Sequence, residues 1–395
     1  MTEWMWKKLK DIAYCNPKES IPKGTIAKKI AMDKLLPFCR DIPEYELEAF
    51  SGGTKFRNGD TIMARITPCL ENGKTAQIGI LDPGEVGFGS TEYIVFRARE
   101  GVDADYIYYL VCSPFVREPA IKSMVGSSGR QRVQTDVVQN LDILVPPYEE
   151  QKRIGGLLKA LDDKIEINTK INKNLFQQAQ LLFQQTLSVS ENIVEVELGS
   201  IADVKGGKRL PKGINLVTMP NNHPYIRVRD LNDVVFATLT ADYEYVDDET
   251  QKSISRYIVA PDDVLISIVG TIGLTAIVDK SLSNANLTEN CVKVTHLKDI
   301  TSEYLLLYLR SLSGQEKIRQ GTVGAVQQKL PIKNIQAIKV PVLRGNAYKE
   351  LTDSLSALFV MISANVTENK NLSQLRDLLL PKLISGELDV STIDI

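Results

Sequence analysis

The sequence predicts an α+β protein: two similar mixed α/β domains separated by a long antiparallel two-helix coiled coil, with the halves related by a pseudo-two-fold axis. Three observations support this fold. The chain of 395 residues repeats itself, two long stretches carry a heptad pattern, and these stretches alternate with globular segments. The length alone suggests two to three domains. We expect domains at 1–147 and 188–346, one helix at 148–187, and a second helix with a C-terminal tail at 347–395.

The repeat consists of short words that recur in the same order in both halves. The matched words are Leu9-x-x-Ile12-Ala13 with Leu198-x-x-Ile201-Ala202, Ser90-Thr91-Glu92 with Leu287-Thr288-Glu289, Tyr109-Leu110 with Tyr308-Leu309, and Gly126-Ser127-Ser128-Gly129 with Gly321-Thr322-Val323-Gly324. Chance could supply any one match, but their common order makes chance a poor explanation. A duplication predicts that both domains share one fold.

Within each domain, short β-like runs follow turn-like residues. Thr61-Ile62-Met63-Ala64 comes after Gly59-Asp60, and the apolar run at 264–269 comes after Asp262-Asp263. Short apolar runs that are bounded by turn signals are typical of buried strands. We therefore expect one strand at each of these two places.

The two long stretches contain no proline before Pro381, which favours continuous helices. Every seventh residue is apolar except for one central Asn in each stretch: Ile154, Leu161, Asn168, Leu175 and Leu182 in the first, and Leu351, Leu358, Asn365, Leu372 and Leu379 in the second. Such a stripe indicates a partner helix, because a period of seven keeps it on one face of a supercoil. The alternative is two ordinary amphipathic helices that pack only on their own domains. The shared Asn argues against it, since a buried Asn favours one register.

The order of globule, helix, globule, helix sets the direction of the pair. The first helix delivers the chain to the second globule, so the second helix must run back antiparallel. We expect Asn168 and Asn365 to lie close together at the centre. From Ile154 to Leu182 the stripe rises about 43 Å at roughly 1.5 Å per residue. Such a spacer would hold two binding domains about one turn of B-DNA apart, which is about 34–36 Å.

Composition excludes several classes of protein. The formal net charge is −2, with 47 basic and 49 acidic residues, so the surface is not globally basic. The five cysteines form no CxxC pair and there are two histidines, so we expect no metal site. No nucleotide-binding motif is visible, and Val145-Pro146-Pro147-Tyr148 lacks the Asn or Asp that precedes Pro-Pro-Tyr in adenine methyltransferases. No catalytic residue is assigned.

The chain also shows no sign of membrane insertion. It has no run of about 18 apolar residues, and its first eight residues lack the apolar core of a secretory signal. We expect a cytoplasmic protein that does not span a membrane.

Positive charge is concentrated in three runs without acidic residues, at 119–135, 205–212 and 317–349. The first and third contain the repeated Gly-x-x-Gly word, so we expect the same element of each domain to be electropositive. Arg can bond guanine through two hydrogen bonds, and Gln can do so with adenine. A solvated surface is the usual alternative for any one charge run. The candidate DNA-binding residues are Lys122, Ser127, Ser128, Arg130, Gln131, Arg132, Lys205, Lys208, Arg209, Arg227, Arg229, Thr322, Gln327, Gln328 and Lys329.

Two helical words are more specific. One runs from Val145-Pro146-Pro147-Tyr148-Glu149-Glu150-Gln151 to Asn168, and the other is Leu375-Arg376-Asp377-Leu378-Leu379-Leu380-Pro381-Lys382-Leu383-Ile384-Ser385-Gly386-Glu387-Leu388. With them, essentially the whole chain resembles the specificity subunits of type I restriction-modification systems. The chain departs from the family pattern at 341–350, where Pro341-Val342-Leu343-Arg344-Gly345-Asn346 replaces the usual Pro-Pro and Glu-Glu-Gln entry to the second helix.

The resemblance implies two target-recognition domains that each read one half of a gapped double-stranded DNA target. It implies helices that set the gap and dock two methyltransferase subunits, and further restriction/translocase subunits. S-adenosylmethionine, ATP and Mg²⁺ would then belong to the partners, and this chain would bind no cofactor and catalyse no reaction. Two alternatives remain open: a coiled-coil scaffold or adhesin that spaces two binding heads without DNA, and a self-sufficient methyltransferase or nuclease.

Overall fold

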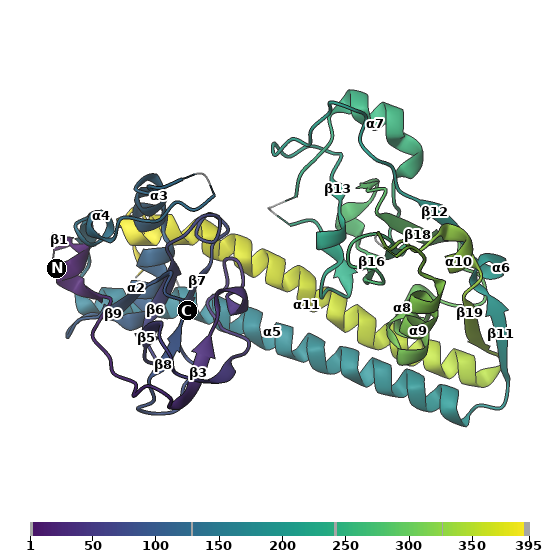
Figure 1. Cartoon of the computed structure of the whole chain (residues 1–395), viewed down its shortest axis with the longest axis horizontal. Coiled ribbons are helices and arrows are strands. Elements are labelled where there is room, and N and C mark those ends of the chain that lie inside the picture. The colour runs from purple at the N-terminus through teal and green to yellow at the C-terminus, as the bar shows by residue number, and fades with distance from the viewer. Residues whose placement is uncertain (1–2, 128, 241–242, 326, 391–395) are drawn as a thin grey trace. The chain divides into compact units, whose positions relative to one another are not determined.

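The computed structural model describes residues 3–127, 129–240, 243–325 and 327–390 (Figure 1). They form two compact units, each of which contains one globular domain and one part of each long helix. Unit 1 comprises Met1–Asn168 with Glu368–Ile395, and unit 2 comprises Thr169–Thr367. The compact units thus differ from the four consecutive segments expected, because both long helices contribute side chains to both cores.

The globular part of unit 1 contains two four-stranded sheets, of order β2-β9-β6-β7 and β4-β3-β8-β5, and the ribbon β1-β10. The strands are β1 Met5–Lys8, β2 Ala13–Cys15, β3 Ile26–Ile30, β4 Glu46–Ala49, β5 Thr54–Phe56, β6 Thr61–Ala64, β7 Thr75–Gln77, β8 Gly87–Gly89, β9 Tyr93–Ala98 and β10 Asp142–Val145. The expected strand at 61–64 is confirmed, and all four of its residues are buried.

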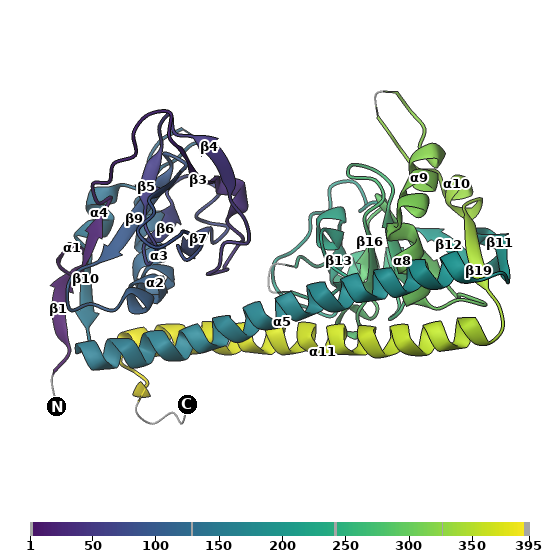
Figure 2. The same ribbon diagram turned by 90° about the horizontal axis from the view of Figure 1, so that it is seen from below.

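The helices of this globular part are α1 Leu9–Ile12, α2 Ala104–Cys112, α3 Pro114–Lys122 and α4 Thr135–Gln139. Helix α2 begins at the N-cap Asp103, whose carboxylate accepts a hydrogen bond from the backbone of Tyr106 at 2.8 Å. Every residue from 106 to 111 is buried, because α2 lies between the sheet of β6 and β9 and the first half of the long helix α5 (Figure 2).

Unit 2 contains the five-stranded sheet β12-β18-β15-β16-β14 and the ribbons β11-β19 and β13-β17. Its strands are β11 Ile193–Glu197, β12 Asp203–Gly206, β13 Tyr225–Ile226, β14 Phe236–Ala237, β15 Val264–Ser267, β16 Thr275–Val278, β17 Asn286–Leu287, β18 Cys291–Thr295 and β19 Lys339–Leu343. Its short helices are α6 Leu198–Ile201, α7 Asp248–Ile254, α8 Ser302–Arg310, α9 Leu312–Gly321 and α10 Ile332–Gln336.

The two units repeat one order of elements, which confirms the expected duplication. In each unit a ribbon strand and a short helix lead into a sheet, as β1, α1 and β2 in unit 1 and as β11, α6 and β12 in unit 2. The sheet order β2-β9-β6-β7 matches β12-β18-β15-β16. Two consecutive helices, a short helix and the second ribbon strand then precede a long helix in both units.

The residue-by-residue register of some matched words was wrong. Tyr93 begins β9 and pairs with the last residue of β6, while Cys291 begins β18 and pairs with the last residue of β15. These two residues are therefore equivalent, so Glu92 matches Asn290 and not Glu289. A short matched motif can be offset by a residue or more from the structurally equivalent position, because loop insertions shift the sequence relative to the strands.

Helices α2 and α8 show the same slip. Their N-caps are Asp103 and Thr301, and each cap side chain accepts a hydrogen bond from a tyrosine three residues later. Counting from the caps, Tyr109 matches Leu307 and not Tyr308.

The long helices are α5 Tyr148–Val189 and α11 Asn346–Ser385. Within unit 1, Asp162 contacts Arg376. Within unit 2, the ring of Phe176 lies 6.2 Å from that of Phe359. Residue numbers fall along α11 as they rise along α5, so the two helices form the expected antiparallel pair (Figures 1 and 2).

All ten seam positions are buried or half-buried. Ile154, Asn168, Leu175 and Leu351 are buried, and the other six are half-buried. Burial also extends beside the seam to Leu158, Phe183, Leu355 and Phe359, which pack into the cores of the domains. The helices therefore pack both on each other and on a globular domain, so the alternative of helices packed on their own domains describes part of the arrangement.

Asn168 and Asn365 were expected to lie close together, and the structure gives each of them another asparagine of the partner helix as its hydrogen-bond partner. Within unit 1, Asn168 donates to Glu368 at 2.7 Å and to the side chain of Asn369 at 2.9 Å. Within unit 2, Asn365 donates to Asn172 at 2.8 Å. The antiparallel register thus matches each Asn with a residue one helical turn along the partner helix.

None of the helices in the described ranges is long and apolar enough to cross a membrane.

Candidate nucleic-acid interface

A hairpin loop follows helix α3 in unit 1 and projects from the domain (Figure 1). Val125 and Arg132 exchange both backbone hydrogen bonds, at 3.0 and 2.9 Å, and so close the loop. The carbonyl of Gln131 accepts a hydrogen bond from Thr67, which ties the loop to the segment after β6. Gly126 adopts φ +134°, and a Cβ there would meet a backbone oxygen at 3.0 Å, so the turn requires glycine.

Unit 2 carries the same hairpin after α9, where it also projects from the domain (Figure 2). Val323 and Lys329 exchange both backbone hydrogen bonds at 2.9 Å. Gly324 adopts φ +102°, with a Cβ position only 2.4 Å from a backbone oxygen. Gly126 therefore matches Gly324, whereas Gly321, the partner expected from the sequence, is the last residue of α9. The expectation that one element recurs is confirmed, and its register was wrong by three residues.

The hairpins present polar side chains to solvent. In unit 1, Ser127 and Arg130 are exposed and Gln131 is half-buried, while Ser128 lies outside the described residues. In unit 2, the exposed residues are Gln327, Gln328 and Lys329. Thr322 instead caps the C-terminus of α9, and its hydroxyl donates to the carbonyl of Ile318 at 2.9 Å.

The base of the first hairpin carries an arginine that is held by a carboxylate. Arg132 Nε donates to both oxygens of Glu92, at 2.9 and 3.0 Å, and Arg132 Nη2 donates to one of them at 2.6 Å. Arg65 Nε lies 3.8 Å from the same carboxylate. The hydrogen bonds from Arg132 hold the pKa of Glu92 below its usual value, and burial opposes them only partly. Glu92 therefore stays ionised and orients the Arg132 guanidinium.

In the folded structure, carboxylates lie beside many of the predicted DNA-binding cations. Six of the predicted DNA-binding residues form ion pairs with carboxylates: Lys122 with Glu118, Arg132 with Glu92, Lys205 with Asp203, Arg209 with Glu289, Arg227 with Glu244, and Arg229 with Asp230. Three of these carboxylates lie within four residues of the cation, and three come from distant segments, so a run without acid in the sequence does not leave its cations unpaired.

Some predicted cations remain without a carboxylate. In the part of the chain that the structure describes, Arg130 and Lys329 form no ion pair. Lys208 lies 5.6 Å from the centre of the Tyr257 ring. These cations, together with the loop amides, can bind phosphate or the edges of bases. Within the described ranges, no group of His, Cys, Asp and Glu could hold a metal ion.

Sequence reasoning missed Arg65 and Glu92 as parts of this interface. Glu92 was visible in the repeated Ser-Thr-Glu word, which served only to align the halves. Its partner Arg132 lies forty residues along the chain, so no local pattern could join the two.

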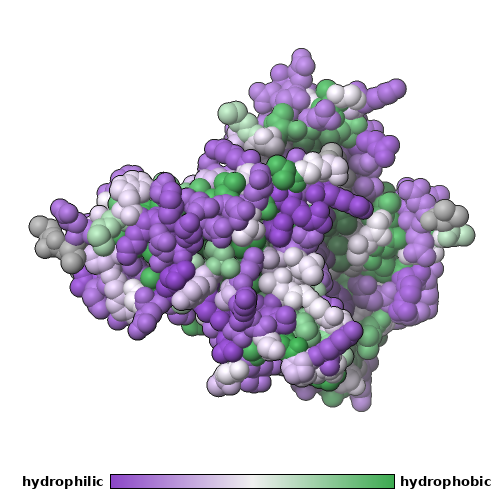
Figure 3. Space-filling model, turned by 60° about the vertical axis from the view of Figure 1, so that its left-hand side comes forward, coloured by the Kyte–Doolittle hydropathy of each residue, from purple (hydrophilic) through white to green (hydrophobic). Residues whose placement is uncertain are grey.

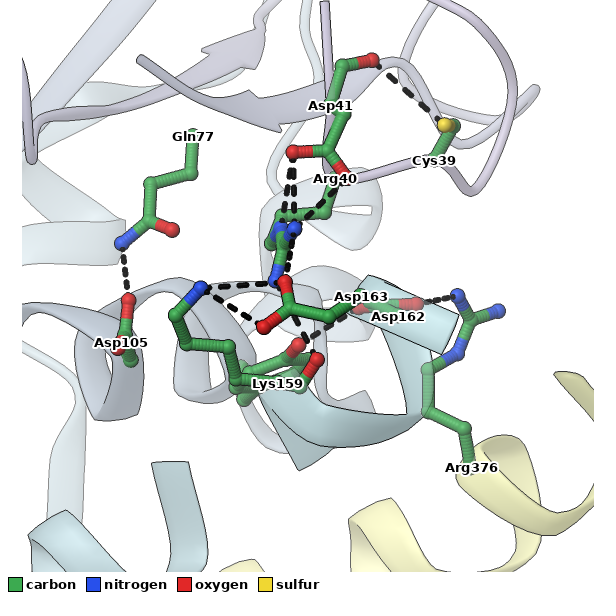
Figure 4. A network of polar contacts seen from close by, with 10 residues as sticks. Cys39, Arg40, Asp41, Gln77, Asp105, Lys159, Asp162, Asp163 and Arg376 are labelled. Carbon is green, nitrogen blue, oxygen red and sulfur yellow. Dashed lines mark hydrogen bonds and ion pairs between the residues drawn. The ribbon is translucent and has the colours of Figure 1, made fainter. Parts of the chain in front are cut away.

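A polar network positions the first domain on the helices within unit 1 (Figure 4). Arg40 is 5% exposed and contacts Asp163 of α5 at 2.7 Å and Asp41 at 2.9 Å. Asp162, also of α5, accepts a hydrogen bond from Tyr109 at 2.6 Å and pairs with Arg376 of α11 at 2.6 Å. Buried ionic hydrogen bonds are directional, so this network fixes the orientation of the domain on the helices.

Comparisons with known proteins agree with this architecture. The family described as the type I restriction modification DNA specificity domain matches residues 1–177 and 190–372. The EcoAI specificity subunit of a type I restriction enzyme from Escherichia coli is 31% identical over 202 residues, which are 49% of this chain and 34% of the relative. The HindI specificity subunit from Haemophilus influenzae is 23% identical over 375 residues, covering 76% of this chain and 81% of the relative.

A solved structure has the same fold. The crystal structure of the type I restriction-modification S subunit from M. genitalium aligns over 96% of both chains with a TM-score of 0.55 and 15% identity. By contrast, the alignment with the EcoAI subunit spans only about a third of the length of that relative. The duplicated domains, the antiparallel helices and the match of both halves to one family place this chain in the family of type I restriction modification DNA specificity domains.

Proposed function

We propose that this chain is the DNA-specificity subunit of a type I restriction-modification complex and reads a gapped, two-part target. One observation carries the proposal: a glycine-dependent hairpin with cationic and amide side chains, closed by the same backbone pairing, recurs at the equivalent place in both units. Two such hairpins on one chain suit two half-sites. Because their residues differ, the half-sites should differ in sequence.

The helix pair would set the gap and dock two methyltransferase subunits. Unpartnered apolar side chains on its surface support docking, since large exposed apolar residues are typical of interaction sites. They are Ile167, Ile171, Leu181, Val189, Val360, Met361, Leu375 and Leu378. On the face of the molecule in Figure 3, hydrophobic residues form separate patches among hydrophilic ones.

The proposal assigns the chemistry to partner subunits. S-adenosylmethionine, ATP and Mg²⁺ would bind to methyltransferase and restriction/translocase subunits, and this chain would act on DNA without catalysing a reaction. Such a complex would work in the cytoplasm, where its DNA target lies.

The test is the methylation pattern that the chain directs. Mapping adenine methylation in cells with and without this gene should reveal a motif of two short words separated by a fixed gap. Insertion of one heptad in α5 and one in α11 should change the gap and leave both words unaltered. An unchanged gap would contradict the spacer role.

A binding assay separates this proposal from a scaffold that does not touch DNA. The complex purified through this chain should shift duplex DNA, and the affinity should fall steeply with salt because bound phosphates release counterions. The absence of any salt-sensitive DNA binding would favour the scaffold. Methyl transfer by the purified chain alone would instead revive a self-sufficient methyltransferase.

A further inference from the structure

At the base of the two hairpins, equivalent backbone positions carry different side chains. In unit 1, Val133 donates a backbone hydrogen bond to Arg65, and in unit 2 Leu330 donates one to Ile268. Arg65 is therefore equivalent to Ile268.

Backbone hydrogen bonds also show which residues of unit 2 are equivalent to Glu92 and Arg132 of unit 1. Arg65 donates a backbone hydrogen bond to the carbonyl of Glu92, and Ile268 donates one to that of Asn290. Since Arg132 and Lys329 close the two hairpins, they are equivalent as well. The group Arg65, Glu92 and Arg132 of unit 1 is thus replaced by Ile268, Asn290 and Lys329 in unit 2.

The two groups have the same formal charge. Two arginines and one glutamate carry +1, as does one lysine beside an isoleucine and an asparagine. The attraction for phosphate is therefore similar at the two places. What differs is geometry, because a guanidinium is a rigid planar fork of donors and an ammonium is a point charge on a flexible stem.

Glu92 occupies one edge of the Arg132 fork. It accepts from Nε and Nη2, which leaves the outer edge, formed by Nη1 and the second Nη2 hydrogen, for a ligand. The backbone at both ends of the ion pair is also fixed. The backbone of Arg132 exchanges two hydrogen bonds with that of Val125, and the amide of Glu92 donates to the hydroxyl of Ser90 at 3.1 Å.

A hollow of about 460 Å³ lies beside Arg132. It is lined by Arg65, Val125, Arg132, Val133, Gln134, Thr135 and Asp136. Arg65 Nε is buried and has no hydrogen-bond partner, and such a buried unsatisfied donor is costly unless a ligand or water fills it. The hollow thus lies beside an arginine whose guanidinium is held by a carboxylate.

We propose that Glu92 is a positioning residue that presents the outer edge of Arg132 to one guanine in the first half-site, whereas the equivalent Lys329 binds a phosphate in the second. A guanidinium whose Nε and Nη2 are held by a carboxylate can present its remaining donors to the two acceptors of guanine, O6 and N7. A lysine without a carboxylate beside it has no such orientation. This inference rests on the proposed function.

The alternative is that Glu92 only stabilises the domain. Ion pairs that are partly open to solvent contribute little stability, and this one is 45% exposed on the arginine side. A merely structural pair would affect binding to all DNA sequences alike. A positioning pair would affect the preference for one base.

The test compares Glu92→Gln and Arg132→Lys with the matched control Glu289→Gln. Glu289 also holds an arginine, Arg209, but that side chain is 81% exposed and lies outside the hairpin. Each variant is made in the full chain and purified with the subunits that accompany it. Base preference at each position is measured by selection from a random duplex pool. Affinity for non-target DNA and the melting temperature are measured in parallel.

The preference for guanine at one position of the first half-site should fall by about 5- to 150-fold in Glu92→Gln, the range of one good bidentate contact. Affinity for non-target DNA should stay equal or rise, because the variant loses one negative charge. Arg132→Lys should lose the same preference while it keeps the charge. The second half-site and the melting temperature should not change, and Glu289→Gln should retain the guanine preference.

Two results would overturn the inference and leave the proposed function intact. One is an unchanged guanine preference in Glu92→Gln. The other is an equal fall in target and non-target affinity together with a lower melting temperature. A wild-type complex without any base preference would instead remove the proposed function itself.

Discussion

In unit 1 the contact between the globular domain and the long helices contains ionised side chains, whereas in unit 2 it consists of packed aromatic rings. In unit 1 the pair Asp162–Arg376 joins the two helices, and Tyr109 of the globular domain donates a hydrogen bond to Asp162. Counted along the heptad stripes, the equivalent residues of unit 2 are Phe359 and Ala179, both buried. Phe359 packs against Phe176 and Phe236, at ring distances of 6.2 and 6.1 Å.

Unit 2 has a half-buried cation at this contact, and it comes from the globular domain. Arg310 of α8 matches Cys112 of α2, counted from the helix caps. Its guanidinium lies 5.2 Å from the ring of Phe176 and donates to the carbonyls of Val234 and Thr275. Burial lowers the pKa of Arg310 to about 10. Unit 2 thus places an arginine of its globular domain against an aromatic ring of α5, whereas unit 1 places Arg376 of α11 beside a carboxylate.

This difference teaches that one fold can rest on two kinds of contact. A buried ion pair loses hydration when it forms, so it adds little net stability but is very costly to break. Aromatic packing adds stability with less demand on orientation. We therefore expect unit 1 to be the more sensitive unit to single polar substitutions and to acid.

The largest effect is expected for Arg376→Ala. It leaves the buried Asp162 without its cation, so the free energy of unfolding of unit 1 should fall by about 3–5 kcal/mol. Both tryptophans, Trp4 and Trp6, lie in unit 1, so urea unfolding followed by tryptophan fluorescence reports on this unit. The control Asp377→Ala removes a mostly exposed partner of Arg376 and should cost at most about 1 kcal/mol. Equal losses of stability in Arg376→Ala and Asp377→Ala would show that the buried pair Asp162–Arg376 does not stabilise unit 1.

A second comparison removes one hydroxyl from each unit. Tyr109→Phe deletes a hydrogen bond to the carboxylate of Asp162 and should cost about 1.5–3 kcal/mol, as bonds to charged groups do. Tyr304→Phe deletes a bond to the carbonyl of Pro341 and should cost about 0.5–1.5 kcal/mol. Hydrogen exchange of α2 and α8 measures each unit separately. The reverse order would contradict the distinction between charged and neutral contacts.

The seam asparagines sharpen the comparison at smaller scale. Asn168 is buried and its Oδ1 has no hydrogen-bond partner, whereas Asn365 is half-buried. Asn168→Leu should raise the stability of unit 1 by about 1 kcal/mol, because it removes an unsatisfied buried acceptor. Asn365→Leu should change unit 2 by no more than about 0.5 kcal/mol. A loss of stability in Asn168→Leu would mean that its bonds to α11 outweigh that cost.

The smallest effect concerns pH. Burial raises the pKa of Asp163, but hydrogen bonds from Arg40 and Lys159 outweigh it and lower that pKa below the usual value. The stability that Asp163 contributes is present above its ordinary pKa of about 4 and is lost as pH falls through the lowered pKa. Unit 1 should therefore lose this contribution to its stability in acid. Asp163→Asn should flatten this loss, measured as urea midpoints by tryptophan fluorescence between pH 7 and 3.

Local patterns in the sequence were enough for the duplication, the two long helices, their antiparallel direction, the short strand at 61–64 and the place of the hairpins. Each depends on periodicity, turn residues or chain order, which are properties of neighbouring residues. The family resemblance rested on two such helical words and is confirmed by the match to both halves.

Tertiary structure alone decided which side chains meet. Asn168 lies against Asn369 because the stagger of two helices depends on packing along their whole length. Glu92 reaches Arg132 only after a strand and two helices have folded between them. The exchange of ion pairs for aromatic rings at the domain contacts follows from long-range packing in the same way. Periodicity defines the face of an element that is buried, whereas its partner depends on residues far away in the chain.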